Sequence, residues 1–406
     1  MDYKLIALGI YSLVFVYNMI LNIVAYRSAG NPMPDNVKDI YDEVTYVKWQ
    51  AYHGEKCRLE IWGTVLSFVI NFILLAVDFY AFFGNMAGSN VYLQTIVVLA
   101  VFVLVDTVVG TVANYIDTMI IEQKYGFNNT TIKTFVVDRV KELLITMVLM
   151  IGLMCLFTLI HQSMGDWILI LFSIILVVIL GLVMFLYPLL TKIFNKFTPL
   201  EDGELKTKLT ALLEKYGYKV KTIDVMLASE RTTKSNAYFS GFGKMKTIVL
   251  YDNLINSMTT DEICAVFAHE MGHGLHKDTI KNNIMSVLMV VTLVLLAWLT
   301  VRYPEIYTAF GFNSVNYGFA LILILMVEFA LVSPVFGLIT SAISRRAEYR
   351  ADAVAVKEGY GPALISGLKK LSKENFSNLA PSKMLVVLSY SHPPMSERLA
   401  AIEKGR

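Results

Sequence analysis

The pentapeptide His269-Glu270-Met271-Gly272-His273 has the residue types and spacing that suit metal chemistry. Residues four apart in a helix lie one turn apart on one face, so the two imidazoles can bind one Zn²⁺ ion. Glu270 lies beside them in sequence and can reach a water molecule at the metal as a general base. The pattern fixes only three residues and also occurs by chance, so its surroundings must decide its meaning.

These surroundings predict a helix. Thr259 and Glu262 make a capping box, which is typical of a helix N-terminus, and Val266 and Phe267 belong to the apolar face that follows. The alternative interpretation is a surface helix with two hydrogen-bonded histidines and no metal. A third ligand elsewhere in the chain would argue against that alternative.

Glu348 is the candidate for the third ligand. Zinc hydrolases of this class keep three protein ligands and leave the fourth position to water. Asp352 lies one helical turn beyond Glu348, where it can accept the second imidazole proton of a histidine ligand. An ordinary charged helix beside the membrane is the alternative for this stretch. A zinc site filled by His269, His273 and Glu348 has no vacant position for His276. We therefore expect His276 to lie at the surface or at a helix end.

Two residues near the C-terminus have side chains suited to transition-state stabilisation. His392 precedes a helix that starts at a proline pair, and Arg398 lies in that helix. Both side chains can donate hydrogen bonds to the oxygen that becomes negative when water attacks a peptide carbonyl. Spacing alone leaves a role outside the site open for both residues.

The composition indicates a membrane protein that contacts lipids. Of the 406 residues, 56% are hydrophobic and 17% are charged, whereas an average soluble domain has about 25% charged residues. The formal net charge of +2 indicates no nucleic-acid partner. Cys57, Cys155 and Cys264 are too scattered for a cysteine zinc site or a disulfide framework.

Seven apolar segments are long enough to cross a bilayer, whose core of about 30 Å needs about 20 helical residues. The predicted spans are Leu5–Tyr26, Ile61–Phe83, Val91–Ile116, Leu143–Ile160, Trp167–Leu190, Ile284–Val301 and Phe319–Ile343. Lys and Arg residues gather in the connections after spans one, three and five and after span seven. The connections after spans two and four have none, and that after span six has only Arg302. Because basic residues stay on the cytoplasmic side, we expect the N-terminus outside and the C-terminus and zinc site in the cytoplasm.

Several spans carry polar residues that are costly in contact with lipid, among them Asn71, Asp78, Asp106 and Glu328. They indicate either hydrogen bonds between helices or a hydrated chamber inside the bundle. The largest connection, residues 191–283, is predicted to contain a helix over 201–216 and strands over 222–227, 235–239 and 246–251.

The expected fold is therefore mainly α, with seven transmembrane helices and a small cytoplasmic α/β protease domain. The predicted division is as follows: residues 1–190 hold spans one to five, 191–283 the protease domain, 284–343 spans six and seven, and 344–406 a cytoplasmic tail with Glu348, His392 and Arg398.

The chain resembles the Ste24-type CAAX prenyl endopeptidases of the M48 metallopeptidases. The resemblance rests on residues 122–128, 235–239, 248–252, 269–273, 344–352 and 391–399 together with the seven spans. It implies a helical cage around a water-filled chamber with zinc at its cytoplasmic end. It also implies that Asn236 holds the substrate backbone as an added strand, and that His392 and Arg398 act in the transition state. The chain is shorter than the eukaryotic pattern, which suggests a prokaryotic member.

The expected function is that of an integral membrane zinc endopeptidase. Its substrates are peptides or proteins, cut near the C-terminus, that are prenylated or otherwise membrane-associated. One alternative is an HtpX-like quality-control protease, although that type has fewer spans. Another is a non-catalytic membrane protein that binds lipidated peptides, although such a protein has no use for Glu270 as a base.

Overall fold

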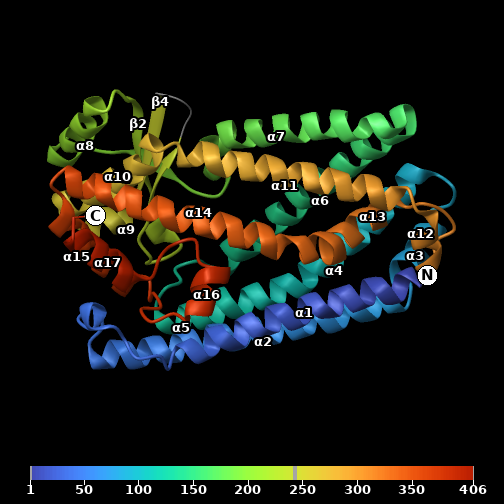
Figure 1. Cartoon of the computed structure of the whole chain (residues 1–406), viewed down its shortest axis with the longest axis horizontal. Helices are drawn as coiled ribbons and strands as arrows, with labels where there is room; N and C mark the ends of the chain where they lie inside the picture. The colour runs from blue at the N-terminus through green and yellow to red at the C-terminus, as the bar shows by residue number, and fades with distance from the viewer. Residues whose placement is uncertain (1, 241–244, 406) are drawn as a thin grey trace.

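The computed structural model describes residues 2–240 and 245–405. Long helices run side by side along most of the molecule, and a small α/β part lies at one end (Figure 1). The long helices are α1 (Tyr3–Ser28), α2 (Glu43–Ala76), α4 (Val91–Tyr115), α6 (Ile132–Met164), α7 (Ile168–Leu190), α11 (Asp278–Val301) and α14 (Phe329–Lys357). The N-terminus lies at the end of the bundle far from the α/β part (Figure 1).

Shorter helices connect or cover these elements. They are α3 (Phe79–Met86), α5 (Gln123–Tyr125), α8 (Glu204–Lys215), α9 (Asp252–Ser257), α10 (Thr260–Leu275), α12 (Pro304–Ala309), α13 (Tyr317–Leu323), α15 (Gly361–Glu374), α16 (Lys383–Leu388) and α17 (Met395–Glu403).

The bundle is that of a multi-pass membrane protein. Six helical stretches of the described residues are long and apolar enough to cross a membrane. One of them, Ile132–Val183, is 52 residues long and contains α6 and most of α7. These two helices reverse direction near Gly165, which has a φ of +57° (Figure 1). When α6 and α7 are counted as two spans, the total is seven, which is the number that the sequence predicts.

Span two differs in detail from the continuous segment predicted over Ile61–Phe83. The α2 helix ends at Ala76, and Asp78 adopts a left-handed conformation with a φ of +58° before α3 begins. Lys4 Nζ donates a 2.7 Å hydrogen bond to Asp78 Oδ1, which ties α1 to this break. An ion pair at the membrane end thus replaces the last turns of the predicted span.

Two spans contain π-helical segments. The α4 helix continues through a π-helix, Ile116–Glu122, into α5, and α13 continues through Ile324–Glu328 into α14. A π-helix joins residues five apart by hydrogen bonds and is frequent at functional sites. Helical residues therefore run without a break from Tyr317 to Lys357.

The polar residues of the spans divide between the two interpretations given above. Asp106 lines a cavity of about 580 Å³ between α1, α2 and α4, and also a cavity of about 130 Å³ between α4 and α6. This placement is that expected of a chamber residue. Glu328 instead accepts a 2.6 Å hydrogen bond from Thr300 Oγ1 on α11, which is a bond between helices. Asn71 donates to Ser67 O within its own helix, a bond that does not distinguish the two interpretations.

The α/β part contains a four-stranded sheet. Its strands are β1 (Phe197–Pro199), β2 (Lys219–Met226), β3 (Ala237–Ser240) and β4 (Met245–Tyr251), in the order β1-β2-β4-β3. β2 is parallel to β4, whereas β1 and β3 pair antiparallel with their neighbours. The sheet packs on α8, α9 and α10 through buried residues that include Leu209, Leu213, Ile223, Ile248, Leu250, Leu254 and Phe267. β3 is thus an edge strand of a sheet that packs against α10, the helix that carries His269 and His273.

Candidate metal centre

The α10 helix holds both histidines in a rigid position. Its N-terminus is closed by the predicted capping box, in which Thr259 Oγ1 accepts from Glu262 N and Glu262 Oε2 accepts from Thr259 N. Glu262 also receives hydrogen bonds from Ser366 and Lys370 on α15. Residues 262–269, 271 and 272 of the helix are buried, because α8, α14, α15 and β3 pack against it.

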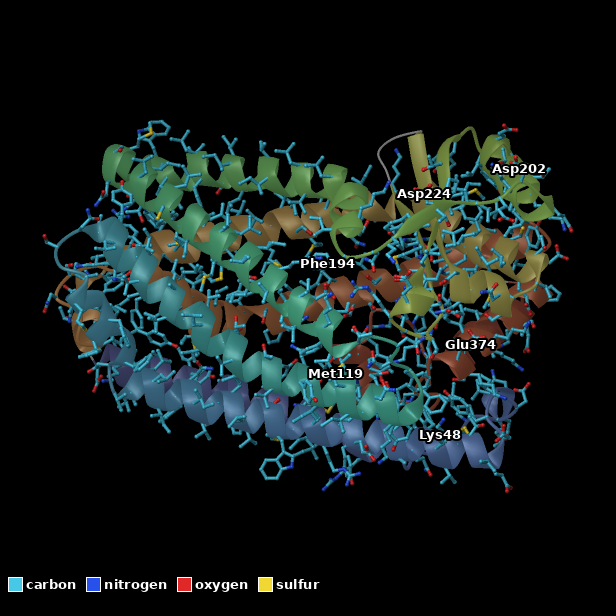
Figure 2. The ribbon with its side chains drawn as sticks, turned by 180° about the vertical axis from the view of Figure 1, so that it is seen from behind. Lys48, Met119, Phe194, Asp202, Asp224 and Glu374 are labelled. Carbon is cyan, nitrogen blue, oxygen red and sulfur yellow. The ribbon has the colours of Figure 1, made fainter. Side chains whose placement is uncertain are left out.

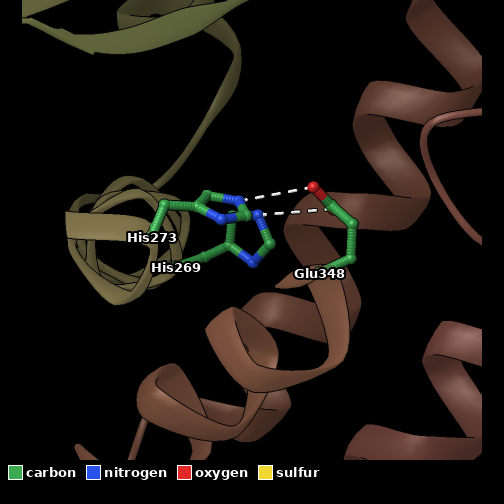
Figure 3. Close-up of side chains that lie close together, drawn as sticks. All are labelled: His269, His273 and Glu348. Atoms are coloured by element: carbon green, nitrogen blue, oxygen red, sulfur yellow. Dashed lines mark ion pairs between the residues drawn. The ribbon is translucent and has the colours of Figure 1, made fainter. Parts of the chain in front are cut away.

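The two histidines and Glu348 meet between α10 and α14 (Figure 3). One nitrogen or oxygen atom from each residue lies within 4.8 Å of the others. Glu348 Oε2 is 3.5 Å from His269 Nε2, and Glu348 Oε1 is 3.3 Å from His273 Nε2. Two imidazoles and one carboxylate form the donor set of a catalytic zinc site with one position left for water.

The buried environment of Glu348 also fits a cation. Its side chain is only 5% exposed, and Oε2 is a buried oxygen without a hydrogen bond of good geometry. Burial of a carboxylate is costly, and the Arg398 guanidinium, whose Nη1 lies 3.2 Å from Oε2, offsets part of that cost. The fit to a cation rests on the donor set of two imidazoles and one carboxylate. The residues present therefore fit a divalent metal ion, held by His269, His273 and Glu348.

Each histidine is oriented by a carboxylate on its other ring nitrogen. His269 Nδ1 is 2.8 Å from Asp352 Oδ1, and His273 Nδ1 is 3.3 Å from Asp278 Oδ2. A proton on Nδ1 that is donated to the carboxylate leaves Nε2 free as a metal ligand. Asp352 lies where the sequence predicts it. Asp278 was not predicted, although its position five residues after His273 was a usable signal.

The electrostatics of His273 reflect these neighbours. Burial disfavours the charged imidazole, but the carboxylates of Glu348, Glu270 and Asp278 outweigh it and raise the pKa of His273 above its ordinary value. Arg350 and Lys281 pair with Asp278, and Arg398 lies beside Glu348, so the carboxylates are partly neutralised and the donor atoms, rather than the net charge, suit the pocket to a cation.

Arg398 and His392 approach the ligands from the C-terminal segment. Arg398 is 7% exposed and donates from Nη2 and Nε to Asp352, over 2.7 and 3.0 Å. Its Nη1 lies 3.2 Å from Glu348 Oε2. His392 Nδ1 is 3.0 Å from the same oxygen, while 66% of its side chain is exposed. The two residues thus lie beside the metal ligands, and the roles that the sequence suggested for them stay predictions.

The remaining predicted residues lie close to this centre or at its edge. Glu270 follows His269 on α10 and is partly buried. His276 caps the C-terminus of α10 and is exposed, as expected. Asn236 is exposed, its Oδ1 accepts from Ala237 N, and it directly precedes β3, which packs against α10. Asn236 therefore lies at the start of the edge strand beside the histidine helix.

Comparisons with known proteins give a consistent result. The family model "CAAX prenyl protease N-terminal, five membrane helices" matches residues 22–196, and "Peptidase family M48" matches residues 199–406. CAAX prenyl protease 1 of Saccharomyces cerevisiae is 30% identical over 431 residues, covering 99% of this chain and 95% of that protein. The human CAAX prenyl protease 1 homolog is 28% identical, covering 91% and 88%. The crystal structure of S. mikatae Ste24p matches with a TM-score of 0.93 at 29% identity, covering 99% of both chains.

Proposed function

We propose a metal, a substrate class and residue roles for this chain, which belongs to peptidase family M48 and is a multi-pass membrane metallopeptidase that acts on peptide or protein substrates. The metal is one zinc ion per chain, and the substrates are cut near the C-terminus. The observation that supports this most is the convergence of His269, His273 and Glu348, with each imidazole backed by a carboxylate.

The side chains divide the catalytic work. When bound, the zinc ion polarises the scissile carbonyl and makes a water molecule more acidic. Glu270 accepts the proton of the attacking water and returns it to the leaving amine. His392, which is exposed beside Glu348, donates a hydrogen bond to the carbonyl oxygen as that oxygen gains negative charge.

Arg398 supports the oxyanion from a more buried position. Two of its nitrogen atoms are engaged by Asp352, so Nη1 is the donor directed toward the metal side. Its positive charge stabilises negative charge on Glu348 and on the reacting oxygen. Its contacts also hold Asp352 against His269.

The proposed substrates are prenylated or otherwise membrane-associated proteins. Two observations support this substrate class: the relatives named above are CAAX prenyl proteases or homologs of them, and the chain has helices long and apolar enough to cross a membrane. The substrate backbone pairs with the edge strand β3 near Asn236, because an extended peptide can add a strand to a sheet edge. The distribution of Lys and Arg supports a cytoplasmic site, and a prokaryotic cell membrane is the location that we propose.

Cleavage of a farnesylated peptide by the purified full chain tests the proposal. We expect hydrolysis near the peptide's C-terminus, loss of hydrolysis with a chelator, and recovery when Zn²⁺ is added back. Elemental analysis of the same sample should give one zinc per chain. The same peptide without its prenyl group distinguishes a lipid requirement from general peptidase activity. Hydrolysis that persists unchanged in the metal-free protein would exclude the zinc mechanism.

A further inference from the structure

Residues 229–236, which we call the lead-in segment, run directly into β3 and are held by neighbours on several sides. The segment ends at Asn236, so its position sets where the edge strand begins. Its residues pair with the connection after α5, with α9 and with α15. The sequence 122–128, which the catalytic chemistry does not use, supplies part of these contacts.

Backbone atoms of the connection after α5 form hydrogen bonds with the lead-in segment. Phe127 O accepts a 3.2 Å hydrogen bond from Thr233 N, and Gly126 O accepts a 3.1 Å bond from Thr233 Oγ1. Asn129 N donates to Arg231 O over 2.9 Å. These bonds tie the end of span three to the segment that precedes β3.

An ion pair strengthens this attachment. Lys234 Nζ lies 3.1 Å from both oxygens of Glu122 and donates to Tyr52 OH over 3.0 Å. It also lies 4.9 Å from the ring centre of Phe127, which adds a cation–π contact. The side chain of Glu122 is only 13% exposed, so solvent screens the pair less than a surface pair.

The π-helix at the end of span three places Glu122 in this position. Because a π-helix joins residues five apart, Asp117 and Glu122 lie on one face, where Lys56 of α2 pairs with both. Figure 2 shows the π-helix around Met119 where the long helices meet the α/β part. Glu122 is thus fixed by α2 and presented to Lys234.

The opposite side of the lead-in segment is held by the α/β part and by α15. Asn253 Nδ2 donates to Thr232 O over 2.8 Å and to Lys234 O over 3.2 Å. Ser235 Oγ donates to Glu374 Oε2 over 2.6 Å, and Glu374 is labelled in Figure 2. The lead-in segment is therefore hydrogen-bonded to the membrane bundle on one side and to the α/β part and α15 on the other.

We propose that Glu122 and Lys234 are positioning residues that hold the edge strand β3 in place for the substrate peptide. This inference rests on the proposed function, in which the substrate pairs with β3. Strand addition requires backbone groups on both sides at hydrogen-bond distance, so a small displacement of β3 weakens docking. Span three thereby takes part in peptide binding without contacting the peptide.

Amide hydrogen exchange in the full chain tests the positioning directly. In Glu122→Gln and Lys234→Gln, we expect faster exchange over residues 229–240 than in the parent. The effect of the double variant should be smaller than the sum of the two single effects, because both variants remove the Glu122–Lys234 pair, while Glu122→Gln also removes the pair with Lys56 and Lys234→Gln the contacts with Tyr52 and Phe127. Lys124→Gln is the matched control, since Lys124 pairs with Glu55 over 2.6 Å at the same helix end and that pair does not contact the lead-in segment. Exchange over 229–240 that is unchanged in both test variants overturns the positioning role.

Kinetics with the farnesylated peptide test the link to substrate. We expect KM to rise about three- to tenfold in the two test variants, while kcat and zinc content stay near the parent values. The Lys124→Gln control should keep both constants. A fall in kcat with unchanged KM overturns the docking role. Failure of the parent itself to cleave the peptide counts against the proposed function, whereas hydrogen exchange still decides the positioning.

Discussion

Gly272 and Ala351 are in contact where α10 crosses α14, and this contact brings the proposed metal ligands together. A Cβ atom added at Gly272 would lie 2.7 Å from Ala351 Cα and 3.2 Å from Ala351 O. Both residues are buried. The histidines flank Gly272 on one helix, and Glu348 and Asp352 flank Ala351 on the other, so any separation of the helices also separates the ligands.

Gly272→Ala should therefore weaken metal binding as well as stability. Overpacking of this kind typically costs 1–3 kcal/mol, and here the added methyl meets backbone atoms that cannot turn aside. Thermal unfolding and zinc content of the purified variant measure both effects. Gly337→Ala on α14 is the control, because a Cβ at that position meets no described atom within 4 Å. Parent-like zinc content in Gly272→Ala would contradict the prediction.

Glu270→Ala should keep zinc and lose peptide hydrolysis. The variant retains His269, His273 and Glu348, while the group that accepts the proton of water is gone. Elemental analysis and an activity assay on one sample check both parts. Turnover near the parent rate would remove Glu270 from the mechanism.

Glu348→Ala should lower zinc occupancy together with activity, because two imidazoles leave the metal under-coordinated. Asp352→Ala should do less, since an outer partner of a histidine ligand typically contributes about 10- to 100-fold in affinity or activity. Titration with zinc under competition from a chelator ranks the two variants. Full occupancy in Glu348→Ala would show that another residue is the third ligand.

Glu262 should make stability depend on pH. Burial disfavours its charge, but hydrogen bonds from Lys370, Ser366 and Thr259 outweigh burial and lower the pKa of Glu262 to about 2. A carboxyl whose pKa is lower in the folded chain stabilises it above the unfolded pKa, near 4.5, and this gain is lost as the pH falls toward 2. The Tm difference between the parent and Glu262→Gln should be full at pH 7 and smaller at pH 4. An equal difference at both values would count against the assignment.

The membrane orientation can be tested with single cysteines in a background lacking Cys57, Cys155 and Cys264. Ser89→Cys and Ser314→Cys lie in the connections after spans two and six, and both positions are exposed. They should react with a membrane-impermeant reagent in intact cells. Asp202→Cys, in the α/β part, should react only after lysis. Labelling of position 202 in sealed cells would place proteolysis on the outer face.

The features that sequence reasoning predicted depend on local patterns. Helix α10 follows from a capping box and a four-residue spacing, and the spans follow from the length of apolar runs. Strands β2, β3 and β4 lie within a few residues of their predicted bounds. Glu348 could be predicted from the sequence because it follows a span that returns the chain to the end of the bundle where α10 lies.

The features that were missed depend on contacts between distant residues. The break at Asp78 is stabilised by Lys4, which lies 74 positions earlier, and no local signal predicts a left-handed aspartate in an apolar run. The engagement of Arg398 by Asp352 depends on the packing of α17 against α14. The π-helix before Glu122 has no recognisable residue pattern and is visible only once Lys56 and Lys234 lie beside it.

The last span continues as one helix to Lys357, so the position of Glu348 depends on how that span lies in the bilayer. Glu348 lies five residues beyond Ile343, the predicted end of span seven, and no loop separates the two. At 1.5 Å per residue this is a continuous helix of about 8 Å, so tilt of the span moves Glu348, and the packing of Gly272 on Ala351 couples α10 to that movement. Helices tilt to match the thickness of the surrounding hydrocarbon layer. We therefore expect the acyl-chain length of the lipids to affect the position of the two helices that carry His269, His273 and Glu348.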